Sequence, residues 1–134
     1  MNYLIDTQIL IWYQLNSSKL GPGVLALINN RKNIVQISQI SLFEIAIKQK
    51  LGKLPELDIT VDALTGLIRQ DDFNLLDLKT KHINAYANIP LLPNHRDPFD
   101  RLLLATAFSE NMPIVSADEN FALYPPQIQL IANR

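Results

Sequence analysis

Short apolar runs alternate with helical patterns along almost the whole chain, and this alternation constrains the fold more than any other feature. Runs rich in β-branched residues predict strands over 2–5, 33–38, 73–78, 113–116 and 128–131. Apolar residues at a spacing of three to four predict helices over 9–15, 22–30, 60–70 and 80–88, others that begin at 38 or 41 and at 97, and a helical turn over 121–123. This order favours an α/β fold, a three-layer α/β/α sandwich with a central, mainly parallel sheet.

The composition is that of an ordinary globular protein. The chain has 134 residues, with 48% hydrophobic and 19% charged residues, and we expect a single domain over 1–134. A formal net charge of -1 gives no general attraction to polyanions, so nucleic-acid binding would need a local patch or a bound cation. No cysteine is present, which excludes disulfides and thiolate metal sites and suits a cytoplasmic protein. We expect no membrane span, because no apolar run is long enough.

The stretch from His95 to Ala107 is expected to open a helix with two acids in its first turn. Proline is favoured at the first helical position, so Pro98 makes Asp97 the natural N-cap. Asp100 lies on the helix face that also carries Leu103, Leu104 and Ala107. A carboxylate that begins an apolar stripe points towards the core or into a cleft beside it. Because an ionised carboxylate is costly to bury alone, Asp100 should meet a cation or hydrogen-bond donors there.

Three further acids are expected at the same edge of the sheet. Asp6 and Asp118 each follow a predicted strand, at the edge where parallel sheets bind ligands. Glu44 occupies a slot in an apolar stripe of the helix after the second strand, beside Ile40, Phe43, Ile47 and Leu51. Four carboxylates in one cleft would repel one another unless cations lay between them, and hard oxygen ligands suit Mg²⁺ or Mn²⁺. Such an ion polarises a phosphoryl oxygen, activates water and stabilises the leaving oxygen.

Each acid alone also has a purely structural interpretation. Asp6 can make turn hydrogen bonds, and Glu44 can extend from the edge of its stripe into solvent. Asp118 can start a short helix, and Asp100 can complement the dipole of its helix. Asp97 is assigned to the cap. The joint placement of Asp6, Glu44, Asp100 and Asp118 is what favours a metal site.

Four blocks of the sequence, 4–12, 41–48, 95–103 and 116–121, resemble those of PIN-domain proteins, and more narrowly VapC-type toxins of toxin–antitoxin pairs. The resemblance covers nearly the whole chain, in order. It implies a Mg²⁺- or Mn²⁺-dependent endoribonuclease whose acidic quartet corresponds to Asp6, Glu44, Asp100 and Asp118. It also implies a homodimer and a small antitoxin whose C-terminal segment blocks the cleft. Two departures are visible: Gln8 stands where the family often has histidine, and Ser116 where it often has threonine.

Other polar residues near the quartet have two interpretations each. Thr7 and Ser116 either orient a ligand carboxylate or metal-bound water, or cap a helix. Arg96 and Arg101 flank the acid pair, where one of them either holds an RNA phosphate or forms a salt bridge to Asp97 or another acid. His95 is expected to order the loop before the helix.

Two other classes of function remain open from sequence. A receiver-like signalling domain also gathers acids and Mg²⁺ at a strand edge, but it needs a lysine at a later strand end, and none follows 114–115. A non-catalytic binding module with the same fold is the other alternative. Water activated by the metal, without a histidine or lysine base, is the expected mechanism of a nuclease.

Overall fold

A five-stranded parallel sheet forms the centre of the computed structural model, which describes residues 1–93, 95, 97–124 and 128–134. Its strands are β1 (Asn2–Ile5), β2 (Ile34–Ser38), β3 (Asn74–Leu76), β4 (Ile114–Ser116) and β5 (Leu130–Ala132). Their order is β3-β2-β1-β4-β5, and every neighbouring pair is parallel. The chain moves outward from β1 to β2 and β3, then returns to the other side of β1. The strand order therefore reverses between β1 and β4, where parallel sheets bind ligands.

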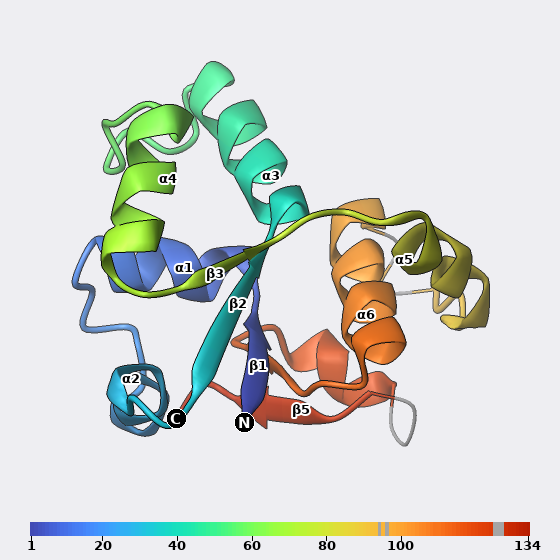
Figure 1. The fold of residues 1–134 in the computed structure, drawn as a ribbon. Coiled ribbons are helices and arrows are strands. Elements are labelled where there is room, and N and C mark those ends of the chain that lie inside the picture. The colour runs from blue at the N-terminus through green and yellow to red at the C-terminus, as the bar shows by residue number, and fades with distance from the viewer. Residues whose placement is uncertain (94, 96, 125–127) are drawn as a thin grey trace.

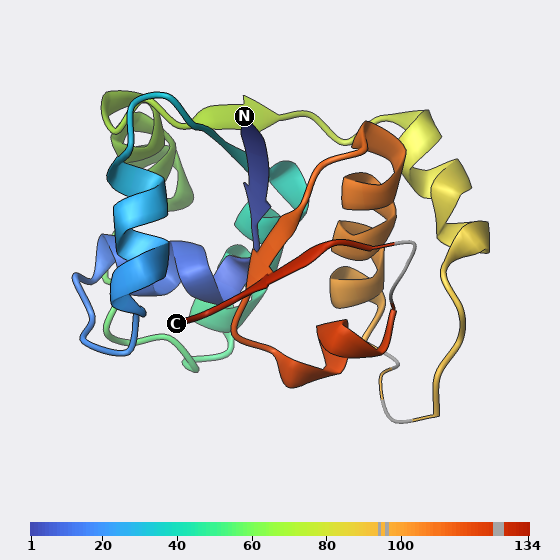
Figure 2. The same ribbon diagram turned by 90° about the horizontal axis from the view of Figure 1, so that it is seen from below.

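Helices cover both faces of the sheet, which confirms the three-layer prediction (Figures 1 and 2). One side carries α1 (Thr7–Gln14), α2 (Pro22–Asn29) and α4 (Val61–Gln70), and the other carries α5 (Thr80–Ala85) and α6 (Pro98–Glu110). Neighbouring residues of β1 point to opposite faces, so Ile5 packs in the core beneath α1, α2 and α4, and Leu4 in the core beneath α6. α3 (Gln39–Lys50) extends beyond the end of β2 (Figure 1).

Several element boundaries differ from the sequence predictions for local reasons. The strand expected over 73–78 is shorter, because the N–H of Phe73 donates to the carbonyl of Ile68 and closes α4. Asp72 takes the left-handed conformation, with φ 61°, in the same turn. The helix expected over 80–88 divides into α5 and the 3-10 helix η1 (Tyr86–Asn88). β5 starts two residues later than expected, and the N–H of Ile128 donates instead to the carbonyl of Tyr124.

Side chains at the carboxyl edge of the sheet start the helices that follow the strands. Asp6 caps α1, and Ser38, rather than Ser41, caps α3. Asp97 caps α6 as predicted, and Asp118 caps the 3-10 helix η2 (Glu119–Leu123). In the part of the chain that the structure describes, no helix is both long and apolar enough to cross a membrane.

Candidate active site

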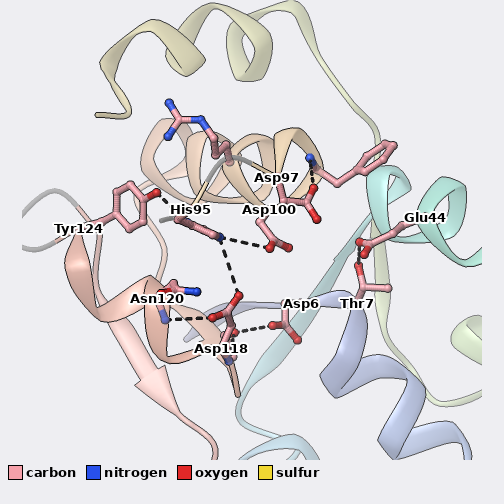
Figure 3. A network of polar contacts seen from close by, with 12 residues as sticks. Asp6, Thr7, Glu44, His95, Asp97, Asp100, Asp118, Asn120 and Tyr124 are labelled. Carbon is pink, nitrogen blue, oxygen red and sulfur yellow. Dashed lines mark hydrogen bonds and ion pairs between the residues drawn. The ribbon is translucent and has the colours of Figure 1, made fainter. Parts of the chain in front are cut away.

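All four predicted acids line one cavity at the point where the strand order reverses. Asp6 follows β1, Asp118 follows β4, Glu44 lies in α3 and Asp100 lies in the first turn of α6 (Figure 3). The cavity has a volume of about 350 Å³ and is lined by Asp6, Thr7, Gln8, Trp12, Glu44, Lys48, Asp97, Asp100, Ala117 and Asp118. We call it the acid cavity. The structure therefore brings together acids that lie up to 112 positions apart in the sequence.

Ser116 fixes two of the acids at once. Its hydroxyl donates to Asp6 Oδ2 at 2.5 Å, and its oxygen accepts the backbone N–H of Asp118 at 2.9 Å. Asp6 Oδ1 accepts from the N–H of Ile9 at 2.9 Å, so both oxygens of this 5%-exposed carboxyl have a donor. The expectation that Ser116 orients a carboxylate agrees with this geometry. The serine preserves the hydroxyl of the threonine that is usual in the family.

Thr7 holds Glu44 in a comparable way. The buried Thr7 hydroxyl donates to Glu44 Oε1 at 2.6 Å, and its oxygen lies 3.0 Å from the hydroxyl oxygen of Ser41. The second carboxylate oxygen of Glu44 pairs with Lys48 Nζ at 3.5 Å, four residues further along α3. The Thr7 hydroxyl and the Lys48 ammonium thus hold the Glu44 carboxylate in the cavity.

The apolar stripe expected around Glu44 is buried only in part. Ile40 is buried and Ile47 is half-buried, but Phe43 is 58% exposed and Leu51 is 61% exposed. The cause is the position of α3, which extends past the end of β2 so that the sheet covers only part of it (Figure 1). Glu44 therefore reaches the cavity because of the place of α3 in the fold, and not because it shares a buried face with four apolar residues.

His95 is the site residue that sequence analysis missed. Its side chain is 4% exposed, and its Nε2 lies 3.2 Å from Asp100 Oδ2 and 3.8 Å from Asp118 Oδ2 (Figure 3). Its Nδ1 lies 2.7 Å from the hydroxyl of Tyr124. Because a tyrosine hydroxyl donates readily to a ring nitrogen, the ring keeps its proton on Nε2, towards the two carboxylates. We expected His95 only to order a loop, since Tyr124, which reveals its orientation, lies 29 residues away.

Asp97 and Asp100 have different surroundings, although they lie one turn apart. Asp97 accepts the N–H of Phe99 at 2.8 Å, is exposed, and lines the rim of the acid cavity. Asp100 is half-buried and points into the cavity beside His95. The cap assignment for Asp97 and the inward direction of Asp100 are both confirmed.

Both interpretations offered for Arg101 are wrong. Its guanidinium donates to the carbonyls of Ile89 and Pro90 and to the hydroxyl of Tyr86, and the side chain is 2% exposed. It is therefore too deeply buried to receive a substrate phosphate, and its hydrogen bonds go to neutral oxygens rather than to an acid. Its role is to tie the segment before the His95 loop to α6. Arg96 lies outside the described residues.

Crowding and burial shift the protonation of two acids. Burial, opposed by hydrogen bonds from Ser116 and Ile9, raises the pKa of Asp6 from 3.8 to about 7, and the charges of Asp100 and Glu44 add to the rise. Burial also raises the pKa of Asp100 to about 6, together with the charge of Asp97 and despite the hydrogen bond from His95. Burial and mutual repulsion therefore disfavour ionisation of these carboxyls at neutral pH. A bound cation would stabilise their ionised forms.

The donor set fits a hard divalent cation. Glu44, Asp97 and Asp100 each offer an oxygen within 4.8 Å of the others. Asp100 and Asp118 form a second group with a ring nitrogen of His95, which would be a ligand only after losing the proton on Nε2. Asp100 belongs to both groups and is therefore the residue best placed to hold an ion in either position. Carboxylate oxygens in this number match the ligands that Mg²⁺ and Mn²⁺ prefer, whereas the single imidazole and the lack of cysteine disfavour softer metals.

Comparison with solved structures finds the same fold in several toxin–antitoxin complexes. A chain of DNA-bound VapBC from Salmonella typhimurium matches with a TM-score of 0.69 at 18% identity, over 100% of this chain and 99% of that one. Chains of VapBC2 from Rickettsia felis bound to a promoter DNA fragment (TM-score 0.67, 18% identity) and of VapBC-5 from Mycobacterium tuberculosis (TM-score 0.63, 17% identity) match over 98% of both chains. These TM-scores over nearly the full length of both chains show a common fold.

The sequence itself matches a family model. A search of curated proteins finds no match. The model of the PIN domain, in contrast, matches residues 3–125, a span that contains all four acids, Ser116 and His95. This match favours the metal-site interpretation over the receiver-like alternative, and it establishes that the chain belongs to the PIN-domain family.

Proposed function

We propose that this protein is a Mg²⁺- or Mn²⁺-dependent endoribonuclease that acts as the toxin of a toxin–antitoxin pair. The observation that carries the proposal is the convergence of Asp6, Glu44, Asp100 and Asp118 on one cavity at the switch point of the sheet. The raised pKa values of Asp6 and Asp100 support it, because strongly shifted pKa values are concentrated at catalytic and ligand-binding sites. Family membership and the fold shared with VapBC chains support it further.

In this proposal the four acids have distinct roles. Asp6 and Asp100 are the principal ligands of the cation, and Glu44 and Asp118 complete the site directly or through water. A divalent cation held by these carboxylates would supply positive charge at the scissile phosphate and a water of lowered pKa. Ser116, Thr7 and His95 hold the carboxylates in place, so that little reorganisation is needed when the substrate arrives. Water adds to phosphorus, one phosphorus–oxygen bond breaks, and the departing ribose oxygen takes up a proton.

The same proposal includes a protein partner and an assembly. A small antitoxin that blocks the acid cavity, a homodimeric toxin and a cytoplasmic location are the expectations for a VapC-type toxin. The fold neighbours support the antitoxin, because they are chains of VapBC toxin–antitoxin complexes. The half-buried Asp100 and Asp118 leave the acid cavity open enough for a polyanion to enter.

The test is RNA cleavage by purified protein in Mg²⁺, in Mn²⁺ and in EDTA. We expect cleavage in either metal, none in EDTA, and none with Asp6→Asn or Asp100→Asn. Asp62→Asn is the matched control, because Asp62 is an acid in the first turn of α4, away from the acid cavity. Circular dichroism of each variant checks the fold. Cleavage that survives in folded Asp6→Asn and Asp100→Asn proteins would refute the proposal, as would cleavage by wild-type protein in EDTA.

A further inference from the structure

A second cavity adjoins the acid cavity and has a different character. It has a volume of about 400 Å³ and is lined by Gln8, Ile11, Trp12, Leu15, Ser17, Lys19, Lys48, Lys53, Leu54 and Glu56. We call it the lysine cleft. Gln8, Trp12 and Lys48 line both cavities, so the two are neighbouring parts of one depression. Its walls come from α1, the segment that follows α1, and the C-terminal end of α3 with its following loop.

The charge of the lysine cleft is opposite to that of the acid cavity. It is lined by three lysines, Lys19, Lys48 and Lys53, and one acid, Glu56, in a chain whose net charge is -1. A further cavity, which adjoins the acid cavity through Ala117 and Asp118, contains Asp118 and Glu119 against the single cation Arg134. A polyanion that reaches the acid cavity is therefore attracted on the α1 and α3 side and repelled beside η2.

The cleft also has an apolar floor with one large aromatic ring. Ile11, Leu15 and Leu54 line it, and the half-buried Trp12 lies where it meets the acid cavity. Proteins that bind single-stranded nucleic acid combine cations along the backbone with aromatic rings on which bases stack. The lysines of the cleft match the phosphates of a single-stranded nucleic acid, and the tryptophan matches its bases. An acidic protein segment would use the lysines but would leave the ring without a specific partner.

We propose that the lysine cleft binds the single-stranded RNA segment that adjoins the scissile phosphate. Lys19, Lys48 and Lys53 contact its phosphates, and a base packs against Trp12. This inference rests on the proposed nuclease function. It places the path of the RNA from the acid cavity towards the loop after α3. Lys48 lies at the junction, where its ion pair with Glu44 at 3.5 Å exchanges for a phosphate contact when RNA enters.

Trp12 is the only tryptophan of the chain, so tryptophan fluorescence reports on the place where the lysine cleft meets the acid cavity. The experiment titrates metal-free protein in EDTA with a single-stranded oligoribonucleotide of about eight nucleotides, within the site sizes of single-strand binders. We expect saturable quenching of the Trp12 emission. An oligonucleotide of the same length without bases should bind more weakly and quench less. Equal quenching by the abasic strand, or by an acidic peptide of the same charge, would overturn the assignment to RNA and indicate a protein ligand.

The lysines are tested with the double variant Lys19→Ala/Lys53→Ala. Two lost phosphate contacts reduce the slope of log affinity against log salt by about 1.4, which is a loss of about 25-fold at 0.1 M salt relative to 1 M. Arg31→Ala/Lys32→Ala is the matched control, because it removes the same charge from exposed positions before β2, at the opposite edge of the sheet. The control should bind RNA like the wild type after a small correction for net charge.

Failure of this inference is distinguishable from failure of the nuclease. Asp100→Asn protein that no longer cleaves RNA but still shows quenching in EDTA supports the cleft. Equal affinity and salt slope in the Lys19→Ala/Lys53→Ala variant and the wild type would overturn the cleft and leave the nuclease proposal intact. If wild-type protein cleaves RNA in Mg²⁺ without any change in Trp12 emission, the cleft assignment is also overturned and the nuclease proposal stands.

Discussion

The acid cavity holds its carboxylates in two different ways on its two sides. On the hydroxyl side, Ser116 donates to Asp6 and Thr7 donates to Glu44. On the histidine side, one imidazole nitrogen faces Asp100 at 3.2 Å and Asp118 at 3.8 Å. The hydroxyl side thus provides a separate hydroxyl for each acid, whereas on the histidine side two acids share a single imidazole N–H.

The difference follows from where the donors come from. Ser116 ends β4 and Thr7 begins α1 directly after β1, so the sheet sets the positions of both, and both are buried. His95 comes from a loop, and its orientation depends on Tyr124 after η2. We infer that the hydroxyl side is fixed by the core and that the histidine side is fixed by a few specific contacts.

Removal of Arg101 and removal of Lys48 should have very different effects on the free energy of unfolding. Arg101→Met removes a buried guanidinium and leaves the carbonyls of Ile89 and Pro90 without donors, so the free energy of unfolding should fall by about 3 kcal/mol. Lys48→Met removes only a partly exposed i,i+4 ion pair with Glu44 and should change it by less than about 1 kcal/mol. Urea unfolding of both variants measures the difference. Equal losses would contradict the view that Arg101 supports the histidine side.

Stability of metal-free protein should depend on pH through the two raised carboxyls. Because the pKa values of Asp6 and Asp100 are raised to about 7 and about 6 in the folded state, folding favours their neutral forms. Their contribution is complete below about pH 4 and is lost as the pH rises from about 4 to about 7. Asp100→Asn should therefore be more stable than the wild type by about 2 kcal/mol at pH 8 and similar to it at pH 4.

Denaturant titrations in EDTA at pH 4, 6 and 8 measure this dependence. Addition of Mg²⁺ at pH 8 should recover the stability of the wild type but have little effect on Asp100→Asn. A wild type that gains stability between pH 4 and pH 8 relative to Asp100→Asn would show that burial and neighbouring acids do not govern Asp100.

His95 should matter for the cation more than for the fold. His95→Ala removes the donor shared by Asp100 and Asp118, and the affinity for Mn²⁺ should fall by about 20-fold, within the range for residues that orient metal ligands. His95→Gln keeps an N–H that can reach Asp100 and should recover part of the affinity. Calorimetric titration with Mn²⁺ gives both values. Unchanged Mn²⁺ affinity in a folded His95→Ala protein would leave the histidine side without a role in the site.

Ser116 should show the smallest effect, because the sheet holds Asp6 in place without it. Ser116→Ala removes one of the two donors to Asp6, and Mn²⁺ affinity and RNA cleavage should each fall by about tenfold. Ser116→Thr keeps the hydroxyl and restores the residue usual in the family, so it should behave like the wild type. A Ser116→Thr variant as impaired as Ser116→Ala would show that the hydroxyl is not what matters.

Sequence patterns located three of the four acids, for physical reasons. Asp6 and Asp118 follow strands, and parallel strands bring their carboxyl ends to one edge, so strand prediction alone brings these two acids together. Asp100 was found because helical periodicity places it above Leu103 and Leu104, which are both fully buried.

The contacts of His95 could not be obtained in this way. Its contact with Tyr124 joins a loop to the residue that follows a 3-10 helix, and no local period relates two such residues. Arg101 was misjudged because its partners are backbone carbonyls, which every sequence contains. The stripe expected on α3 is buried only in part for a related reason: periodicity shows which residues share a face, but only the tertiary fold shows what covers it.

Calorimetric titration with Mn²⁺ at pH 7.5 shows whether the four carboxylates form a cation site. We expect saturable binding by the wild type and by Asp62→Asn, and no binding by Asp6→Asn or Asp100→Asn. If the wild type binds no Mn²⁺ at millimolar concentrations, or Asp100→Asn binds it as tightly as the wild type, the acid cavity is not a cation site.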